Sequence, residues 1–258
     1  MSPVVWPVYR AEFAATAGKT VIWAPLLLFL GFAICLRYWL RWVHQCTAAG
    51  RVLGLWQPQY WWKDWAIAFC LGAVGVTLLY SLQLLAGWGL WNSPTGWSSQ
   101  IWAEGLLVGV GVGFVEELIF RGWLLYELEQ DFRPEVALWL NALIFAIAHF
   151  LRPLSEILAT WPQFAGLLLL GAALVWARRI PHNVDRQTTL GAASGLHGGL
   201  VFAYYQVDVN DLVTPSSSAP EWITGIGGNP LAGLLGLVFL GGICGMTYIA
   251  SHRKQKCV

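Results

Sequence analysis

A succession of long apolar runs constrains this chain more than any other feature of its sequence. Several runs contain about 20 mostly apolar residues, which is the length of helix that crosses the hydrocarbon core of a bilayer. Hydrophobic residues make up 57% of the 258 residues and charged residues only 11%, whereas a soluble domain usually carries about 25% charged residues. We therefore expect an all-α fold, a polytopic transmembrane helical bundle that forms one integral membrane domain over residues 1–258.

Hydropathy and length predict seven spans. They are expected at roughly 20–40, 65–87, 101–125, 135–151, 163–177, 189–205 and 230–250. The fourth and fifth are short and fit tilted or re-entrant segments. Residues 4–18 fit an interfacial segment, and they would make an eighth span if they crossed the membrane. Many of the 17 tryptophans fall at the proposed span ends, as in the aromatic belts of membrane proteins.

Lysine and arginine indicate the orientation, because cytoplasmic loops are enriched in them. Basic residues gather after the first, fifth and last predicted spans, and the loops after the second and sixth contain none. This alternation predicts a multi-pass protein with a cytoplasmic C-terminus. Seven spans would leave the N-terminus outside, and a crossing by residues 4–18 would bring it to the cytoplasmic side.

Charge and cysteine content argue against two classes of function. The net charge is +1, so the chain lacks the basic footprint of a nucleic-acid-binding protein. Its five cysteines form no C-x-x-C pair and no zinc-ligand spacing. We expect no nucleic-acid partner, no cofactor and no metal site built on cysteine.

The third predicted span contains charged residues in the stretch FVEELIFRGW at 114–123. A charged side chain near the bilayer centre costs several kcal/mol, so it is usually paired and functional. Glu117 and Arg121 are four residues apart and share one helix face, with the acid first, as the helix dipole favours. Glu116 is rotated by about 100°, so it has no partner in its own helix and is available as a general base. The alternative is a structural ion pair beside an interfacial glutamate.

Two histidines lie in later predicted spans. His149 follows Phe145 by four residues, and His197 lies in GAASGLHGGLVFAYY, whose glycines repeat every four residues from Gly191 to Gly199. Such a small-residue stripe permits close helix packing, which would hold His197 near the third span. Taken singly, each histidine also fits a hydrogen-bonded packing residue.

The four ionisable groups Glu116, Glu117, His149 and His197 lie deep in three apolar segments. Burying them separately would cost more than bringing them to one wet cavity, so we expect them to converge. Two carboxylates and two imidazoles suit a zinc site, a proton relay or the activation of water.

Three motifs in this order resemble a known family. EELIFR at 116–121 fits EExxxR, Phe145 and His149 in FAIAH fit FxxxH, and His197 in GLHGGLV begins HxxxN. On successive apolar segments, these motifs resemble the CPBP family of CAAX prenyl proteases and bacteriocin-processing enzymes, also called Abi. The resemblance covers about residues 100–205, the expected motif-bearing core, and the later NPLAGLLG stretch also looks similar.

The resemblance implies an all-helical intramembrane endopeptidase of the glutamate type. By that resemblance Glu116 activates water with the assistance of His149, Glu117 and Arg121 support the site, and His197 helps to stabilise the oxyanion. These implied roles use no metal.

One position departs from the family pattern. The Asn of the third motif is Val201 here, and valine cannot donate a hydrogen bond to an oxyanion. Losing one such donor costs about 100- to 1000-fold in rate. Asn141 lies two turns from His149, about 12 Å along the helix axis, so it is a poor replacement unless the helices cross favourably. Tyr204 and Tyr205 are other candidates, and the sequence does not choose among them.

We interpret the chain as an intramembrane endopeptidase that acts on membrane-associated proteins or peptides, with the bilayer and its substrate as partners. The first alternative is a non-catalytic family member that serves as a membrane scaffold, assembly factor or immunity protein with a partner in a membrane complex. Val201 favours it. A transporter with a Glu/His proton relay is the second alternative, although the sequence has neither an inverted repeat nor a pair of broken helices.

Overall fold

The structure is a computed structural model that describes residues 23–93, 99–151, 153–182 and 188–253. Residues 4–18 lie outside the described residues, so their crossing of the membrane stays a prediction. Most of the described chain is helical, and each of the seven predicted apolar segments contains a helix. In chain order the α-helices are α2 (Trp23–Trp42), α3 (Ala49–Val52), α4 (Pro58–Leu85), α5 (Ser99–Glu117), α6 (Leu125–Asp131), α7 (Pro134–Ala148), α8 (Leu154–Thr160), α9 (Gln163–Arg178), α10 (Gly191–Val209), α11 (Glu221–Thr224) and α12 (Leu234–Ser251).

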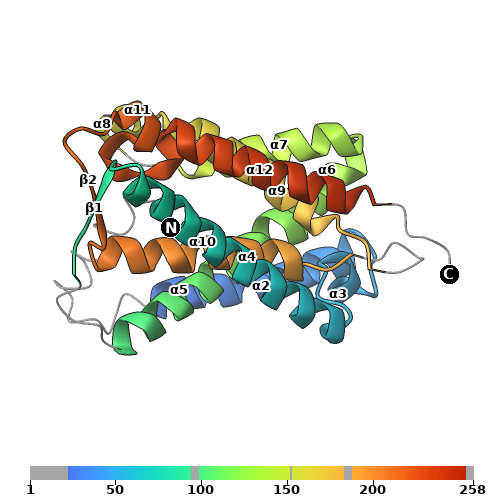
Figure 1. Cartoon of the computed structure of the whole chain (residues 1–258). Coiled ribbons are helices and arrows are strands. Elements are labelled where there is room, and N and C mark those ends of the chain that lie inside the picture. The colour runs from blue at the N-terminus through green and yellow to red at the C-terminus, as the bar shows by residue number, and fades with distance from the viewer. Residues whose placement is uncertain (1–22, 94–98, 152, 183–187, 254–258) are drawn as a thin grey trace.

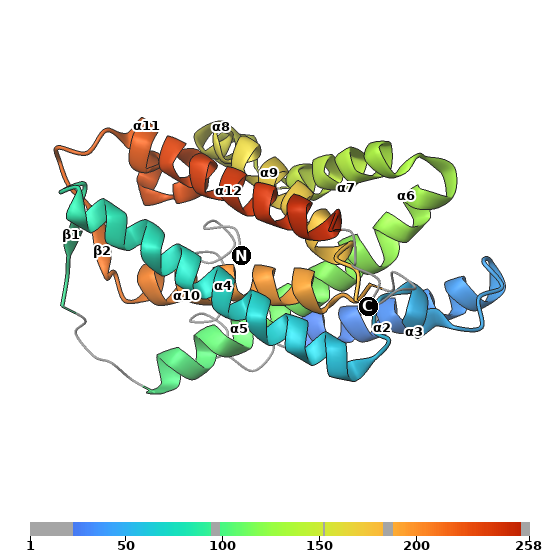
Figure 2. The ribbon, with the colours of Figure 1, turned by 45° about the vertical axis from the view of Figure 1, so that its right-hand side comes forward.

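The longer helices form two layers (Figure 1). One layer contains α2, α4, α5 and α10, and the other contains α7, α9 and α12, an arrangement that the turned view in Figure 2 also shows. Helix α10 makes its most extensive contacts with α4 and α5, and it also touches α9 in the other layer. It therefore packs directly against α5, which carries the first motif, and joins the two layers through α9.

Glycines allow α10 to lie backbone to backbone against both of its neighbours. A Cβ added to Gly195 would meet the carbonyl oxygen of Trp65 in α4, and the glycines one turn before and after it meet the α4 backbone in the same way. On the opposite side, a Cβ on Gly109 of α5 would lie 2.6 Å from the carbonyl oxygen of Gly198. The close packing predicted from the small-residue stripe is confirmed.

A π-helix, Leu118–Leu124, joins α5 to α6 in one helical run, and it includes Arg121. The sequence predicted a regular helix over 101–125, so this widened turn is a departure. Asn141 of α7 donates from Nδ2 to the carbonyl oxygen of Phe120 at 2.7 Å, which gives a main-chain group of the widened turn a partner. Single π turns inside α-helices occur frequently at functional sites.

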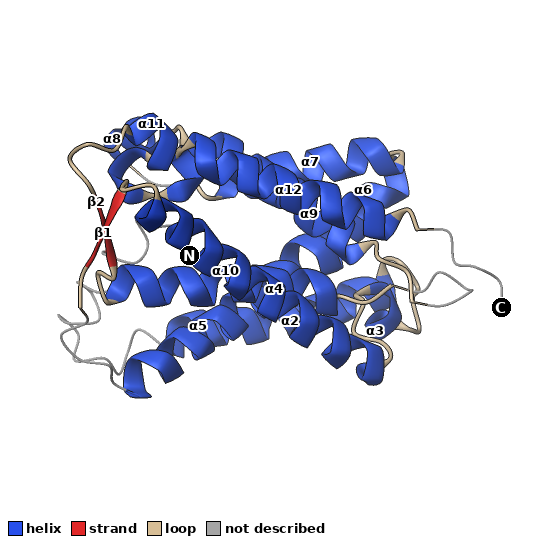
Figure 3. Cartoon of the chain, viewed as in Figure 1, coloured by secondary structure: helices blue, strands red, loops and turns tan. Residues whose placement is uncertain are grey.

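Two short strands depart from the expectation of an all-α fold. The strand β1 (Gly89–Trp91) follows α4, and it pairs antiparallel with β2 (Val213–Pro215), which follows α10. Figure 3 shows this pair at one end of the molecule. Gly89 lies opposite Pro215 and Trp91 opposite Val213. The pair ties together the chain segments that leave two helices already packed side by side.

Fewer helices than predicted have the length and composition of a membrane span. In the described residues, α4 and α12 are long and apolar enough to cross a bilayer, and α8 with α9, which meet at a bend of 78°, would form a third span or a re-entrant loop. The expectation of seven to eight spans is therefore not confirmed. Helix α7, for example, has 15 residues, whereas about 20 are needed for a span.

Large apolar side chains nevertheless face outward along the helices. Leu28 in α2 is 75% exposed and Leu85 in α4 is 85% exposed. Water is a poor environment for so much apolar surface, and contiguous exposed apolar patches mark a surface that meets a membrane or a partner.

Candidate active site

The ion pair between Glu117 and Arg121 is fully buried. Arg121 Nη1 donates to Glu117 Oε1 at 2.8 Å, and both side chains have 0% exposure. Arg121 Nη2 also donates to the carbonyl oxygen of Gly171 in α9 at 3.0 Å, and its guanidinium lies 4.3 Å from the centre of the Phe145 ring. The pairing expected from the spacing of four residues is present, and it ties the end of α5 to α7 and α9.

His197 joins this ion pair from α10. Its Nδ1 lies 2.9 Å from Glu117 Oε1, and since an ionised carboxylate only accepts hydrogen bonds, Nδ1 is the donor. Its other ring nitrogen, Nε2, lies 3.9 Å from Glu116 Oε2. His197 thus stands between the two carboxylates, with one nitrogen directed to each.

His149 faces Glu116 from the end of α7. The helix ends at Ala148 and His149 is its C-cap residue. Its Nδ1 lies 2.7 Å from the Phe145 carbonyl oxygen, which can only accept, so Nδ1 carries a proton. Its Nε2 lies 3.8 Å from Glu116 Oε2, and this is the nitrogen that holds a lone pair when the ring is neutral.

Glu116 Oε2 is nearly equidistant from the two imidazoles. Both separations, 3.8 Å to His149 and 3.9 Å to His197, are too long for a direct hydrogen bond. Oε2 is itself buried and has no hydrogen-bond partner among the described atoms, although the Glu116 side chain as a whole is 28% exposed. A polar contact of this length is suited to a bridging water.

The predicted convergence of the four ionisable groups is confirmed. Glu116 and Glu117 end α5, His149 follows α7, and His197 lies within α10. Their chemical roles stay predictions. Asn141, one of the alternative oxyanion donors, instead donates to the carbonyl oxygen of Phe120.

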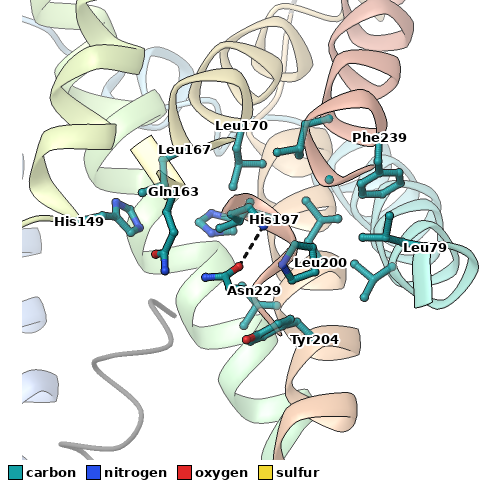
Figure 4. Close-up of a pocket in the computed structure, with 16 residues that line it drawn as sticks. Leu79, His149, Gln163, Leu167, Leu170, His197, Leu200, Tyr204, Asn229 and Phe239 are labelled. Atoms are coloured by element: carbon teal, nitrogen blue, oxygen red, sulfur yellow. Dashed lines mark hydrogen bonds between the residues drawn. The ribbon is translucent and has the colours of Figure 1, made fainter. Parts of the chain in front are cut away.

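A pocket of about 110 Å³ begins at the two imidazoles and extends between α4, α10 and α12. Figure 4 shows the side chains that surround it. Most are apolar, among them Val201, the position where the family motif has Asn. The polar side chains on its wall are His149, Gln163, His197, Tyr204 and Asn229.

Sequence reasoning singled out neither Gln163 nor Asn229. Gln163 is the first residue of α9, and Asn229 lies in the loop before α12, within the NPLAGLLG stretch that looked family-like. An Asn before a Pro is also a common turn former, so its residue type gave no chemical signal. Only the resemblance of the surrounding stretch pointed to this segment.

Comparison with known proteins adds one match. The model of the family described as type II CAAX prenyl endopeptidase Rce1-like matches residues 97–203, which include Glu116, Glu117, His149 and His197. No curated protein and no solved structure matches the chain significantly. Together with the outward-facing apolar helices, the match indicates an integral membrane protein. The segment that carries the site therefore matches the Rce1-like family of type II CAAX prenyl endopeptidases, which confirms the resemblance indicated by the three motifs.

Proposed function

We propose that the protein is an intramembrane endopeptidase that hydrolyses a peptide bond with a water molecule activated by Glu116. The observation that carries this proposal is the position of Glu116 Oε2, which is buried, lacks a hydrogen-bond partner among the described atoms, and lies 3.8 and 3.9 Å from two imidazole nitrogens. One water held by these three groups would have a proton acceptor on one side and imidazoles on the other.

The reaction begins when the water oxygen attacks the carbonyl carbon of the scissile bond and Glu116 accepts a proton from the water. The carbonyl becomes a tetrahedral intermediate with a negatively charged oxygen. The C–N bond then breaks, and the proton passes to the leaving nitrogen from Glu116, directly or through Nε2 of His149. The products are a new carboxyl terminus and a new amino terminus.

Glu117, Arg121 and His197 prepare the site for this reaction. The Glu117 carboxylate accepts hydrogen bonds from both Arg121 and His197 at Oε1. Its Oε2 has no partner among the described atoms, but the side chain is fully buried and its charge is balanced by the Arg121 guanidinium, so we do not assign it the role of the base. It instead holds the imidazole of His197 in place. When His197 is protonated on both nitrogens, its Nε2 donates toward the oxyanion while Nδ1 stays bonded to Glu117.

The substrate class follows from the apolar wall of the pocket. Leucines of α4, α9 and α10 and Phe239 of α12 line it beside the imidazoles, so an extended segment with apolar side chains fits better than a polar peptide. A membrane protein or membrane-associated peptide that enters from the lipid is the substrate class we propose. The name of the matching family makes a CAAX-type C-terminus the first substrate to test.

A non-catalytic role as a scaffold, assembly factor or immunity protein is the second candidate. The observation that favours it is Val201, which presents methyl groups to the pocket where the family motif has an amide. A scaffold would bind its partner without cleaving it, so the two functions differ in a hydrolysis assay.

The test uses the full chain, purified and reconstituted in liposomes, with internally quenched peptides that end in a CAAX sequence with and without a prenyl group. We expect the wild type to cleave at least one peptide and Glu116→Gln to cleave none. The matched control is Glu104→Gln in the same helix, because Glu104 bonds Tyr205 at 3.3 Å outside the site. A folded wild type that cleaves no peptide, or equal turnover by Glu116→Gln, would refute the proposal.

A further inference from the structure

The third motif leaves the site with one hydrogen-bond donor fewer than the family pattern supplies. Val201 lines the pocket one turn after His197 on α10, and its side chain has nothing to donate. An oxyanion in a water-poor site needs preorganised donors, and removing one of them costs about 100- to 1000-fold in rate. A donor from another element that lines the pocket would restore the site.

Three side chains considered from the sequence have other hydrogen bonds. Asn141 donates to the carbonyl oxygen of Phe120 at 2.7 Å. Tyr205 donates to Glu104 Oε2 at 3.3 Å. Tyr204, although it lines the pocket, bonds through its hydroxyl to the carboxylate of Asp208. None of the three has its donor directed to the imidazoles.

Asn229 has the missing property. Its side chain is 4% exposed, and it lines the same pocket as His149 and His197. Its Oδ1 accepts a hydrogen bond from the main-chain nitrogen of Leu231 at 3.0 Å, drawn as the dashed line in Figure 4. Its Nδ2 is buried with no hydrogen-bond partner among the described atoms. Among the described residues that line the pocket, no other has a buried side-chain nitrogen or oxygen without a partner.

A buried amide nitrogen without a partner is costly, and native proteins rarely leave one without a reason. An unmade bond in the resting site that is made in the transition state is how an oxyanion donor acts. The structure also identifies which amide atom is left to donate. Because Oδ1 accepts from the main-chain nitrogen of Leu231, the amide cannot flip without losing that bond, so Nδ2 is the atom that remains unpartnered.

The loop that carries Asn229 is held rigidly. A Cβ on Gly166 of α9 would lie 2.6 Å from the carbonyl oxygen of Leu231, and a Cβ on Gly236 of α12 would meet the carbonyl oxygen of Pro230. Gly225, whose φ is +117°, lies against the main chain of Asn229 itself. Close backbone packing on three sides keeps the amide in one position, which is the preorganisation that transition-state stabilisation requires.

We propose that Asn229 is a catalytic residue whose Nδ2 donates a hydrogen bond to the oxyanion, beside Nε2 of His197, and so replaces the Asn that the third motif lacks at Val201. The inference rests on the proposed endopeptidase function. It makes the loop before α12 a part of the active site, although this loop lies outside the 97–203 segment that matches the family.

The test compares kcat and KM of Asn229→Ser with those of the wild type on the peptide that the wild type cleaves. Serine can still accept from the main-chain nitrogen of Leu231, as cap residues do, but it has no amide to donate. We expect kcat to fall by about 100- to 1000-fold, with KM and the thermal melt nearly unchanged. Asn229→Asp, which keeps both the shape and the acceptor, provides a second variant if the serine variant does not fold.

Rescue separates a catalytic from a structural role. Adding Val201→Asn to Asn229→Ser places an amide at the motif position. We expect the double variant to have a kcat at least about tenfold higher than Asn229→Ser alone, since one donor supplies about 100- to 1000-fold. A loop that merely needs Asn229 for folding would not respond to a change in α10. The control is Gln83→Leu. Gln83 is similarly buried and its Nε2 also lacks a partner among the described atoms, but its side chain does not line the pocket.

The outcomes distinguish the two proposals. If cleavage depends on Glu116 and Asn229→Ser retains full kcat, the inference about Asn229 is wrong while the endopeptidase function stands. Loss of kcat in Gln163→Leu alone would assign the donor to the other amide on the wall and would equally overturn it. If the wild type shows no Glu116-dependent cleavage, the proposed function fails and the inference fails with it.

Discussion

The two sides of the α5 C-terminus place adjacent carboxylates in opposite environments. On one side, Glu117 is completely buried and shares its Oε1 between Arg121 and His197. On the other side, Glu116 is 28% exposed, and its Oε2 meets no donor within hydrogen-bonding distance among the described groups. Of these two neighbouring glutamates, Glu117 is therefore held in a buried ion pair, whereas Glu116 is available to a water or a substrate.

This difference follows from the helix and from what surrounds it. Neighbouring residues of a helix project about 100° apart, so one carboxylate points to Arg121 and α9, while the other lies between the end of α7 and His197 within α10. A buried ion pair stabilises little in net terms but is costly to break. Its value here is geometric, because it positions His197 next to Glu116, the proposed base.

The largest expected effect is a difference in activity and stability between variants of the two carboxylates. Glu116→Gln should lower kcat by about 1000- to 10,000-fold, at the upper end of what general-base catalysis supplies, and leave the thermal melt in detergent unchanged, because no buried pair is broken. Glu117→Gln should lower both the activity and the melting temperature, since Arg121 would lose its counter-charge. Peptide hydrolysis and a melt of each variant give the comparison. Equal loss of stability in the two variants would show that the two sides are not distinct.

The next effect concerns stability. Arg121→Ala leaves Glu117 as a buried charge without its guanidinium, and breaking such a pair costs about 3–5 kcal/mol. The matched control is Arg179→Ala, whose partner Glu129 lies at 2.7 Å but is 37% exposed, so that loss should stay at about 0–1 kcal/mol. Equilibrium unfolding in mixed micelles measures both. Similar losses from the two arginines would mean that water reaches the Glu117 pair.

The same comparison explains what could be predicted from the sequence. The Glu117–Arg121 pair was predictable because a spacing of four residues on a helix places two side chains on one face. The approach of His197 was predictable from the glycine stripe, since small residues permit close packing. Both inferences rest on patterns within a single helix, namely the spacing of residues on one face and a stripe of small residues.

The remaining features depend on contacts that periodicity does not encode. The π turn at Leu118–Leu124 changes the hydrogen-bond register without changing the polarity pattern. The 78° bend between α8 and α9 and the pairing of β1 with β2 join segments through tertiary packing. Asn229 could not be predicted for the same reason, since its distance from the three motifs along the chain gives no sign that it shares a pocket wall with the two imidazoles.

A smaller effect tests the packing that holds the buried side together. Gly195→Ala adds a Cβ that would meet the carbonyl oxygen of Trp65, and overpacking of this kind costs about 1–3 kcal/mol. In Gly242→Ala on α12 the added Cβ has nothing within 4 Å, and alanine has the better helix propensity by about 1 kcal/mol. The two substitutions should therefore shift the melt in opposite directions. A rise in both melts would mean that α10 is not pressed against α4.

The smallest expected effect is that of a chelator, for which we predict no change in activity and no stoichiometric zinc in the purified protein. Within the described residues no set of three or more His, Cys, Asp or Glu side chains is arranged to hold a metal ion. Glu117 Oε1 is engaged by Arg121 and His197, and Nδ1 of His149 is engaged by a carbonyl oxygen. Glu116 Oε2 nevertheless lies 3.8 and 3.9 Å from the Nε2 atoms of His149 and His197, so a modest shift would bring three ligands together, which is enough for a catalytic zinc site. Elemental analysis and hydrolysis in the presence of a chelator therefore decide a real alternative. One zinc per chain, lost together with activity, would turn Glu116 from the base that activates the water into a ligand of the metal that does.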